Sequence, residues 1–123
     1  MIQFSPETGV WLCRRAFQAA PLEACGFILR CGTIVEVRNI ASDPHQEFVM
    51  DPMDALKKFG TEGLSSVVAV WHTHPRGNAR PSARDISAIS SGHVNLDWAY
   101  LVVTKDEVAQ YDPRVLVGDR ATV

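Results

Sequence analysis

The feature that most constrains the fold is an almost continuously apolar run, residues 66–71 (SVVAVW), which leads directly into His72. A strand buried on one face alternates apolar and polar residues, whereas a continuous apolar run is typical of a strand buried on both faces. Such a strand lies at the centre of a sheet and needs cover on both sides. Because 123 residues is the size of one ordinary domain, we predict a single α/β domain over residues 1–123.

Cap-and-proline pairs predict where helices begin. Ser5-Pro6 is typical of a helix start, because a serine side chain caps the first turn and proline is tolerated at the first helical position. Asp51-Pro52 repeats this signature before a helix that stops at Gly60 or Gly63, and Ser82 begins a third helix that ends near Gly92. Four residues at helical spacing predict the buried face of the first helix. These residues are Val10, Cys13, Phe17 and Ala20.

Four further β-rich runs predict the rest of the sheet. Residues 26–31 and 33–37 flank Gly32 as an antiparallel hairpin, and residues 98–104 and 107–111 form a second pair. The predicted order is helix, two strands, helix, strand, helix, two strands. Hairpins separated by helices favour a mixed sheet sandwiched by helices over a run of βαβ units.

Composition excludes several classes of function. Lys and Arg total 12 against 14 for Asp and Glu, a net charge of -2, which gives no basic surface for nucleic acid or an anionic membrane. The three cysteines include no C-x-x-C pair, so neither a disulfide framework nor a thiolate zinc knuckle is indicated. The sequence has no basic signal-peptide region and no apolar run near the roughly 18 residues of a spanning helix. We expect a cytoplasmic protein, and the sequence leaves its oligomeric state open.

His72 and His74 lie one residue apart at the end of the apolar run. Because residues i and i+2 project from the same face of a strand, their imidazoles are expected to converge. Asp85, at the start of the next predicted helix, could bring a carboxylate to the same point. Two histidines and one aspartate with an open fourth position are typical of a catalytic zinc, whereas structural sites close with four protein ligands. A pair of surface histidines is the alternative for an isolated H-x-H.

Ser82 and Asp85 also have a purely structural interpretation. Their spacing resembles a capping box, in which the serine caps the helix and the acid reaches back. The two interpretations are compatible, since a serine hydroxyl can accept a backbone N–H while it donates its own proton elsewhere, and a carboxylate has two oxygens.

Activation of a metal-bound water also needs a proton acceptor that is not itself a ligand. Glu23, shortly before the first predicted strand, is the candidate, although its local sequence alone indicates a solvated charge. Spacing does not exclude other acids. These are Glu7, Glu36, Glu47 and Asp97.

Together these residues resemble the JAMM/MPN+ (JAB) metallopeptidase family. Its pattern is E-x-C-G followed by H-x-H-P-x(6)-S-x-x-D, and the chain carries it from Glu23 to Gly26 and from His72 to Asp85. The order of elements is similar over nearly the whole chain, which implies the JAMM/MPN architecture, broadly shared with cytidine deaminases. The resemblance implies zinc bound by His72, His74 and Asp85. It also implies that Glu23 is the general base and acid and that Ser82 stabilises the oxyanion.

Within the family, the chain is similar to the short prokaryotic and phage branch. Residues 39–44 and 48–56 resemble the middle segment of phage tail-assembly proteins of the JAB type, and other short relatives release ubiquitin-like sulfur carriers. The resemblance therefore implies a zinc metallopeptidase or isopeptidase. Its expected substrate is the small-residue tail of a ubiquitin-like or phage structural polypeptide.

Two other functions fit these residues less well. A non-catalytic MPN-like scaffold that binds a partner generally lacks the ligand set, which is intact here. A zinc nucleoside deaminase needs a P-C-x-x-C signature, which the sequence lacks.

Overall fold

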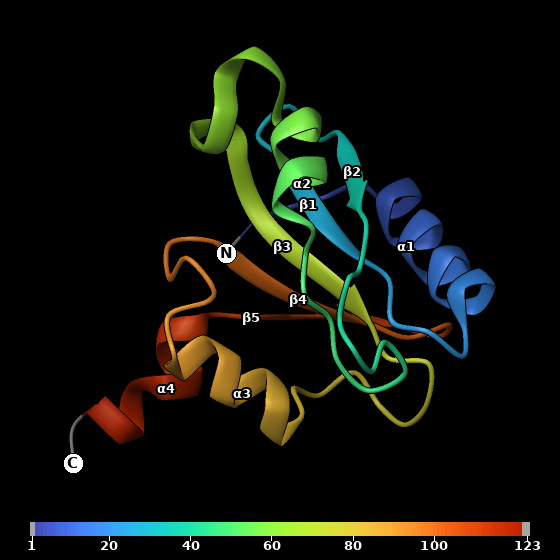
Figure 1. The fold of residues 1–123 in the computed structure, drawn as a ribbon. Helices are drawn as coiled ribbons and strands as arrows, with labels where there is room; N and C mark the ends of the chain where they lie inside the picture. The colour runs from blue at the N-terminus through green and yellow to red at the C-terminus, as the bar shows by residue number, and fades with distance from the viewer. Residues whose placement is uncertain (1, 122–123) are drawn as a thin grey trace.

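The computed structural model describes residues 2–121, without the side chains of residues 60–62 and 118–121. It shows a five-stranded sheet with the order β2-β1-β3-β4-β5 (Figure 1). The strands are β1 (Cys25–Leu29), β2 (Ile34–Val37), β3 (Val67–Thr73), β4 (Ala99–Val103) and β5 (Val108–Tyr111). The central strand β3 pairs antiparallel with β1 and parallel with β4, so the sheet is mixed, as predicted.

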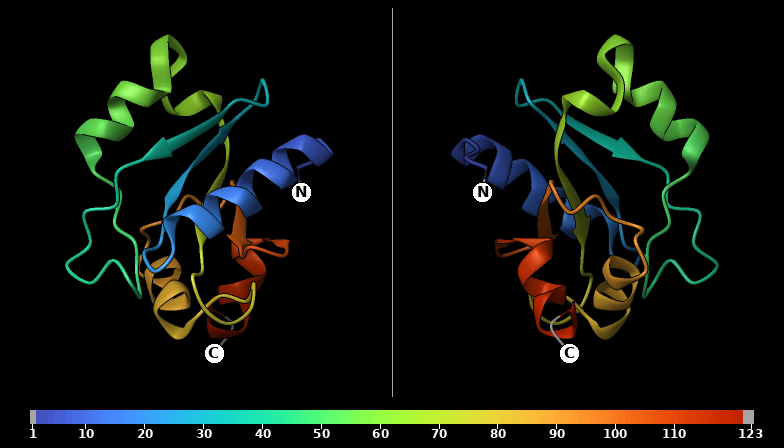
Figure 2. Two further views of the ribbon diagram at one scale, coloured as in Figure 1. Left: turned by 90° about the vertical axis from the view of Figure 1, so that its right-hand side faces the viewer. Right: turned by 90° about the vertical axis from the view of Figure 1, so that its left-hand side faces the viewer.

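Helices cover both faces of this sheet. On one face, α1 (Pro6–Ala19) packs Leu12 and Ala16 against Ala69 and Trp71 of β3. The other face is covered by α2 (Pro52–Phe59), α3 (Ala83–Ser90) and α4 (Pro113–Ala121), which pack around Val70 and Tyr100. Figure 2 shows α1 in front of the sheet in one view and behind it in the other. Both faces of β3 are therefore buried, and the predicted α/β sandwich is confirmed.

The buried face of α1 was predicted wrongly. The helix begins at Pro6 with Ser5 as its cap, as expected, but its buried residues are Leu12 and Ala16. Val10 and Phe17 are 56% and 70% exposed. Apolar residues occur all around this helix, so helical spacing alone did not identify the side that contacts the sheet.

Helix α4 was not predicted at all, although Asp112-Pro113 repeats the cap-and-proline signature. Asp112 Oδ1 accepts the N–H of Arg114 at 2.9 Å, as a capping residue does. Leu116 and Val117 then pack against the core. None of the helices in the described part of the chain has the length and apolarity that a membrane span requires.

Gly26 of β1 lies where the backbone of β2 and the side chain of Trp71 approach most closely. A Cβ atom at Gly26 would overlap Val35 O and would lie 2.8 Å from Trp71 Cζ2. The indole of Trp71 is fully buried and donates to Phe27 O at 3.3 Å, so it has little freedom to withdraw. Only glycine fits at this position.

We expect Gly26→Ala to lower the free energy of unfolding by at least about 2 kcal/mol, because the added methyl overlaps a backbone oxygen. Gly9→Ala is the control, since its Cβ would meet only Phe4 Cε2, at 3.7 Å, within a helix. That change should raise stability by about 0.5–1 kcal/mol. Urea unfolding followed by tryptophan fluorescence measures both, and a loss below about 1 kcal/mol in Gly26→Ala would contradict the close approach.

Candidate functional site

The end of β3 and the start of α3 bring three donor atoms together. His72 Nε2 lies 3.0 Å from His74 Nε2, and these atoms lie 3.2 and 3.1 Å from Asp85 Oδ2. The parallel pairing of β3 with β4 forces the chain to cross over after Thr73, and α3 lies in this crossover. The predicted convergence of the imidazoles is confirmed, and in the described residues this group has the geometry to hold a metal ion.

The donor atoms suit a tetrahedral metal ion. Ligand atoms around zinc, with bonds of about 2.0–2.1 Å, lie about 3.3 Å apart, close to the separations seen here. His74 Nδ1 lies 2.9 Å from Asn78 O, an atom that can only accept, so Nδ1 donates and a neutral ring presents a lone pair at Nε2. A lone pair that faces a carboxylate oxygen is stable only with a cation or proton between them.

Burial and charge set the protonation of this group. Burial lowers the pKa of His72 more than Asp85 raises it, so this ring is neutral. Burial also lowers the pKa of His74, but hydrogen bonds to Asp85 and Asn78 O outweigh it and the net shift is upward. Burial raises the pKa of Asp85, yet the two histidines hold it well below its usual range. The site therefore offers an ionised carboxylate and a neutral imidazole, the forms that bind a metal.

Ser82 and Asp85 form the predicted capping box. Ser82 Oγ accepts the N–H of Asp85 at 3.1 Å, and Asp85 Oδ2 accepts the N–H of Ser82 at 2.8 Å. Because the same Oδ2 faces both imidazoles, the helix cap also orients the candidate ligand. The cap does not use the hydroxyl proton of Ser82, which can be donated to a bound molecule.

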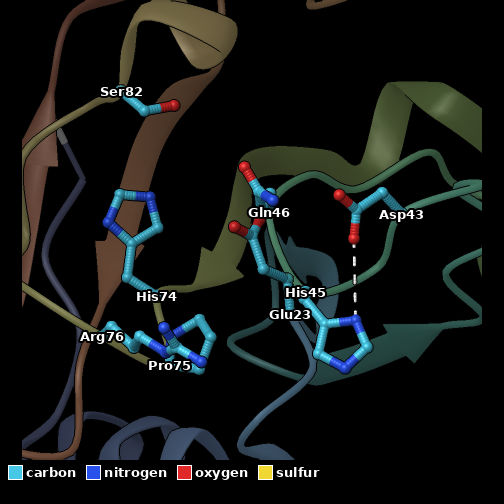
Figure 3. A pocket seen from close by; sticks show the side chains of 8 residues that line it. All are labelled: Glu23, Asp43, His45, Gln46, His74, Pro75, Arg76 and Ser82. Atoms are coloured by element: carbon cyan, nitrogen blue, oxygen red, sulfur yellow. Dashed lines mark ion pairs between the residues drawn. The ribbon is translucent and has the colours of Figure 1, made fainter.

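A pocket of about 700 Å³ opens beside this group. Figure 3 shows His74 and Ser82 on one side of it and Glu23 and Gln46 on the other. Its lining residues are Glu23, Asp43, His45, Gln46, His74, Pro75, Arg76 and Ser82. The pocket thus brings the predicted base and the predicted oxyanion donor to one cavity with a candidate ligand.

Glu23 is 6% exposed, so the interpretation of its side chain as a solvated charge was wrong. Its backbone N–H donates to Pro44 O at 2.7 Å, and Asn39 Nδ2 donates to its carbonyl at 2.9 Å. Its Oε1 is buried without a hydrogen-bond partner among the described residues. Burial, reinforced by the charge of Asp85, raises the pKa of Glu23 to about 8. A carboxyl that titrates near neutral pH can both accept and release a proton.

The other candidate acids have different partners or positions. Glu36 pairs with Arg15, Asp97 with Arg114 and Glu47 with Arg84. Glu7 is exposed in the first turn of α1.

Two other catalytic features, a cysteine nucleophile and a deaminase motif, do not fit this site. Cys25 is fully buried, and burial raises the pKa of its thiol to about 12, which argues against a thiolate nucleophile. The stretch from His45 to Glu47 has the H-x-E spacing of zinc deaminases, but His45 pairs with Asp43 and lies outside the three-residue metal group.

Sequence reasoning missed Phe48, whose ring stacks on His72 with the centroids 4.5 Å apart. It also missed Asn39, which binds the backbone of Glu23 and of the loop before α2. Both residues lie in the stretches that resemble the phage tail-assembly segment, 39–44 and 48–56, but neither belongs to a spaced motif, so nothing in the sequence linked them to the metal group.

Most of the chain matches a known protein family. The family described as prokaryotic homologs of the JAB domain matches residues 11–116. The chain belongs to this family. A relative in Thermus thermophilus is named "Probable TtuB-protein conjugate cleaving protease" and is 39% identical over 56 residues. The match covers 43% of this chain and 37% of that protein, so it spans little more than a third of the relative's length.

A solved structure shares the fold of this JAB domain. A Desulfitobacterium hafniense protein with a known solution structure is 24% identical with a TM-score of 0.63, and the match covers 91% of this chain and 90% of that one. A JAB1/MPN domain protein from Archaeoglobus fulgidus is 17% identical with a TM-score of 0.47, and the match covers 87% of each chain.

The burial of Glu23 predicts a specific pH dependence of stability in metal-free protein. Its folded-state pKa of about 8 exceeds the value of 4.5 for an unperturbed glutamate. Its contribution to stability is therefore complete below 4.5 and is lost as the pH rises through 8. Glu23→Gln removes this loss of stability. In the presence of a chelator at pH about 8.5, the melting temperature of the variant should therefore exceed that of wild type by about 4 °C or more, the shift that 1 kcal/mol produces in a small domain.

Thermal melts between pH 5 and 9 in the presence of a chelator measure this difference. Glu107→Gln, at an exposed position before β5, is the matched control and should follow wild type. Parallel curves for Glu23→Gln and wild type would show that Glu23 is not held as a neutral acid.

Proposed function

We propose that this JAB-family protein is a zinc-dependent isopeptidase that hydrolyses the bond after the tail of a ubiquitin-like protein. The observation that carries the proposal is the group formed by His72, His74 and Asp85 beside the buried Glu23. Membership of the family and the conjugate-cleaving name of the Thermus relative support it. Zinc at this group would lower the pKa of a water molecule toward about 7 and polarise the substrate carbonyl.

Glu23 is the proposed general base and acid. Its carboxylate takes a proton from the attacking water as the bond between water oxygen and carbonyl carbon forms, and it later gives this proton to the leaving amine as the C–N bond breaks. In the metal-free protein burial raises the pKa of Glu23 to about 8, and a zinc cation nearby would lower it, toward the range in which a carboxyl can accept and release a proton near neutral pH.

Ser82 is the proposed donor to the developing oxyanion. Its hydroxyl oxygen is held by the N–H of Asp85, which fixes its position, while its proton remains available. A preorganised donor of this kind typically contributes about 3–4 kcal/mol to catalysis.

The substrate is proposed to enter as an extended chain with small residues next to the scissile bond. In this proposal the chain lies in the pocket, with His74 and Ser82 on one side of it and Glu23 and Gln46 on the other (Figure 3).

A phage structural polypeptide is the alternative substrate predicted from the sequence. A partner-binding scaffold without activity is the alternative function, and the metal content distinguishes it.

Purified protein should carry about one zinc per chain, because three donors and an open position are typical of a catalytic site. His74→Ala should lose this metal, whereas His93→Ala, at an exposed position outside the group, should keep it. Elemental analysis of the three proteins measures the content. Equal zinc in wild type and His74→Ala would remove His74 from the ligand set, and no zinc in wild type would favour the scaffold.

Glu23→Gln should retain zinc but lose about 10²- to 10⁴-fold in hydrolysis, the usual effect of a lost general base. A suitable substrate is a Gly-Gly-terminated peptide joined to the ε-amine of a lysine peptide. Glu107→Gln again serves as the control. Hydrolysis within a few-fold of wild type would assign the proton transfer to another acid, and loss of zinc would make Glu23 a ligand.

A further inference from the structure

The two candidate histidine ligands are held in different ways. His74 Nδ1 donates to Asn78 O at 2.9 Å. His72 Nδ1 is buried and has no hydrogen-bond partner among the described residues. Metal-binding histidines almost always donate their second ring nitrogen to an oxygen, and this bond fixes the orientation of the ring. Because His72 lacks that bond among the described residues, its ring is oriented by packing together with the contact of Nε2 with Asp85 Oδ2.

Phe48 supplies the closest aromatic packing of His72. The two rings are stacked, with centroids 4.5 Å apart and an angle of 23° between their planes. The ring of Tyr100 of β4 also packs against this imidazole, with centroids 5.4 Å apart and an angle of 57° between the ring planes. The χ2 torsion of histidine is otherwise broad, but here rotation of the ring would drive its edge into the face of Phe48. The stack therefore limits the direction in which Nε2 points.

The backbone on both sides of Phe48 is held by the side chain of Asn39 together with the backbone bond from Ile40 N to Val49 O. Asn39 Nδ2 donates to Glu47 O at 3.1 Å, and Asn39 Oδ1 accepts the N–H of Val49 at 3.0 Å. These bonds hold the backbone on both sides of Phe48. The backbone that carries the Phe48 ring therefore has a fixed position beside the imidazole.

We propose that Phe48 is a positioning residue that orients His72 and thereby sets the affinity of the metal group. The inference rests on the proposed metal site and concerns how the orientation of one of its ligands is maintained. Phe48 also lines a groove of about 630 Å³ together with Met50 and Trp98. A change at Met50 alters this groove and the same segment, and it leaves the stack on His72 in place.

The test compares Phe48→Leu, Phe48→Tyr and Met50→Leu with wild type. Leucine keeps apolar volume but removes the flat ring, whereas tyrosine keeps the ring at a position that is half-buried. The zinc dissociation constant, measured by competition with a chromophoric chelator and corrected for the folded fraction, should rise about 10- to 100-fold in Phe48→Leu. The dissociation constants of Phe48→Tyr and Met50→Leu should stay within about threefold of the wild-type value, well below the effect of losing the group that orients a ligand.

Cobalt substitution gives a second readout, since the visible absorption of Co²⁺ reports ligand geometry. The spectrum should change in Phe48→Leu and be restored in Phe48→Tyr. Wild-type affinity in Phe48→Leu, or equal loss in Phe48→Tyr or Met50→Leu, would overturn the inference. Absence of zinc binding by wild type would instead overturn the proposed function, so the two failures are distinguishable.

Discussion

The structure depends on the burial of β3 on both faces. Each large apolar side chain that this strand buries contributes about 1.5–3 kcal/mol, and the faces are covered by α1 on one side and by α2, α3 and α4 on the other. Covering the second face with α3 requires a crossover between β3 and β4, which run parallel. That crossover returns Asp85 to the end of the strand that carries His72. The constraint that builds the core therefore also assembles the candidate site.

The same burial makes the site costly to maintain. A buried polar atom without a hydrogen bond costs about 1–3 kcal/mol, and both Glu23 Oε1 and His72 Nδ1 are in that position among the described residues. Asp85 differs, because its Oδ2 accepts the N–H of Ser82 and faces two imidazoles. The unpaired atoms thus lie on the proposed base and on one proposed ligand. Sites that perform chemistry commonly trade stability in this way.

The sequence predicted those parts of the molecule that local rules determine. The apolar run of β3, the pleat that brings His72 and His74 together, and the capping box of Ser82 and Asp85 all follow from neighbouring residues. The buried face of α1 could not be predicted, since it depends on which side of the helix meets the sheet. The burial of Glu23 was missed for a related reason, because Asn39 and Pro44, distant in sequence, hold its backbone beneath the loop.

Asn39 links two parts of the site that the spaced motif leaves separate. Its side chain binds the carbonyl of Glu23 and also brackets Phe48, whose ring lies on His72. The proposed base and the first proposed ligand therefore share one support, although Glu23 precedes β1 and His72 lies on β3. His45 and Gln46 occupy the same loop and line the pocket, but none of the bonds made by Asn39 involves their atoms. Under the proposed function, the loop can present different side chains to a substrate while it holds the proposed base and ligand in place, which would separate recognition from catalysis within a small domain.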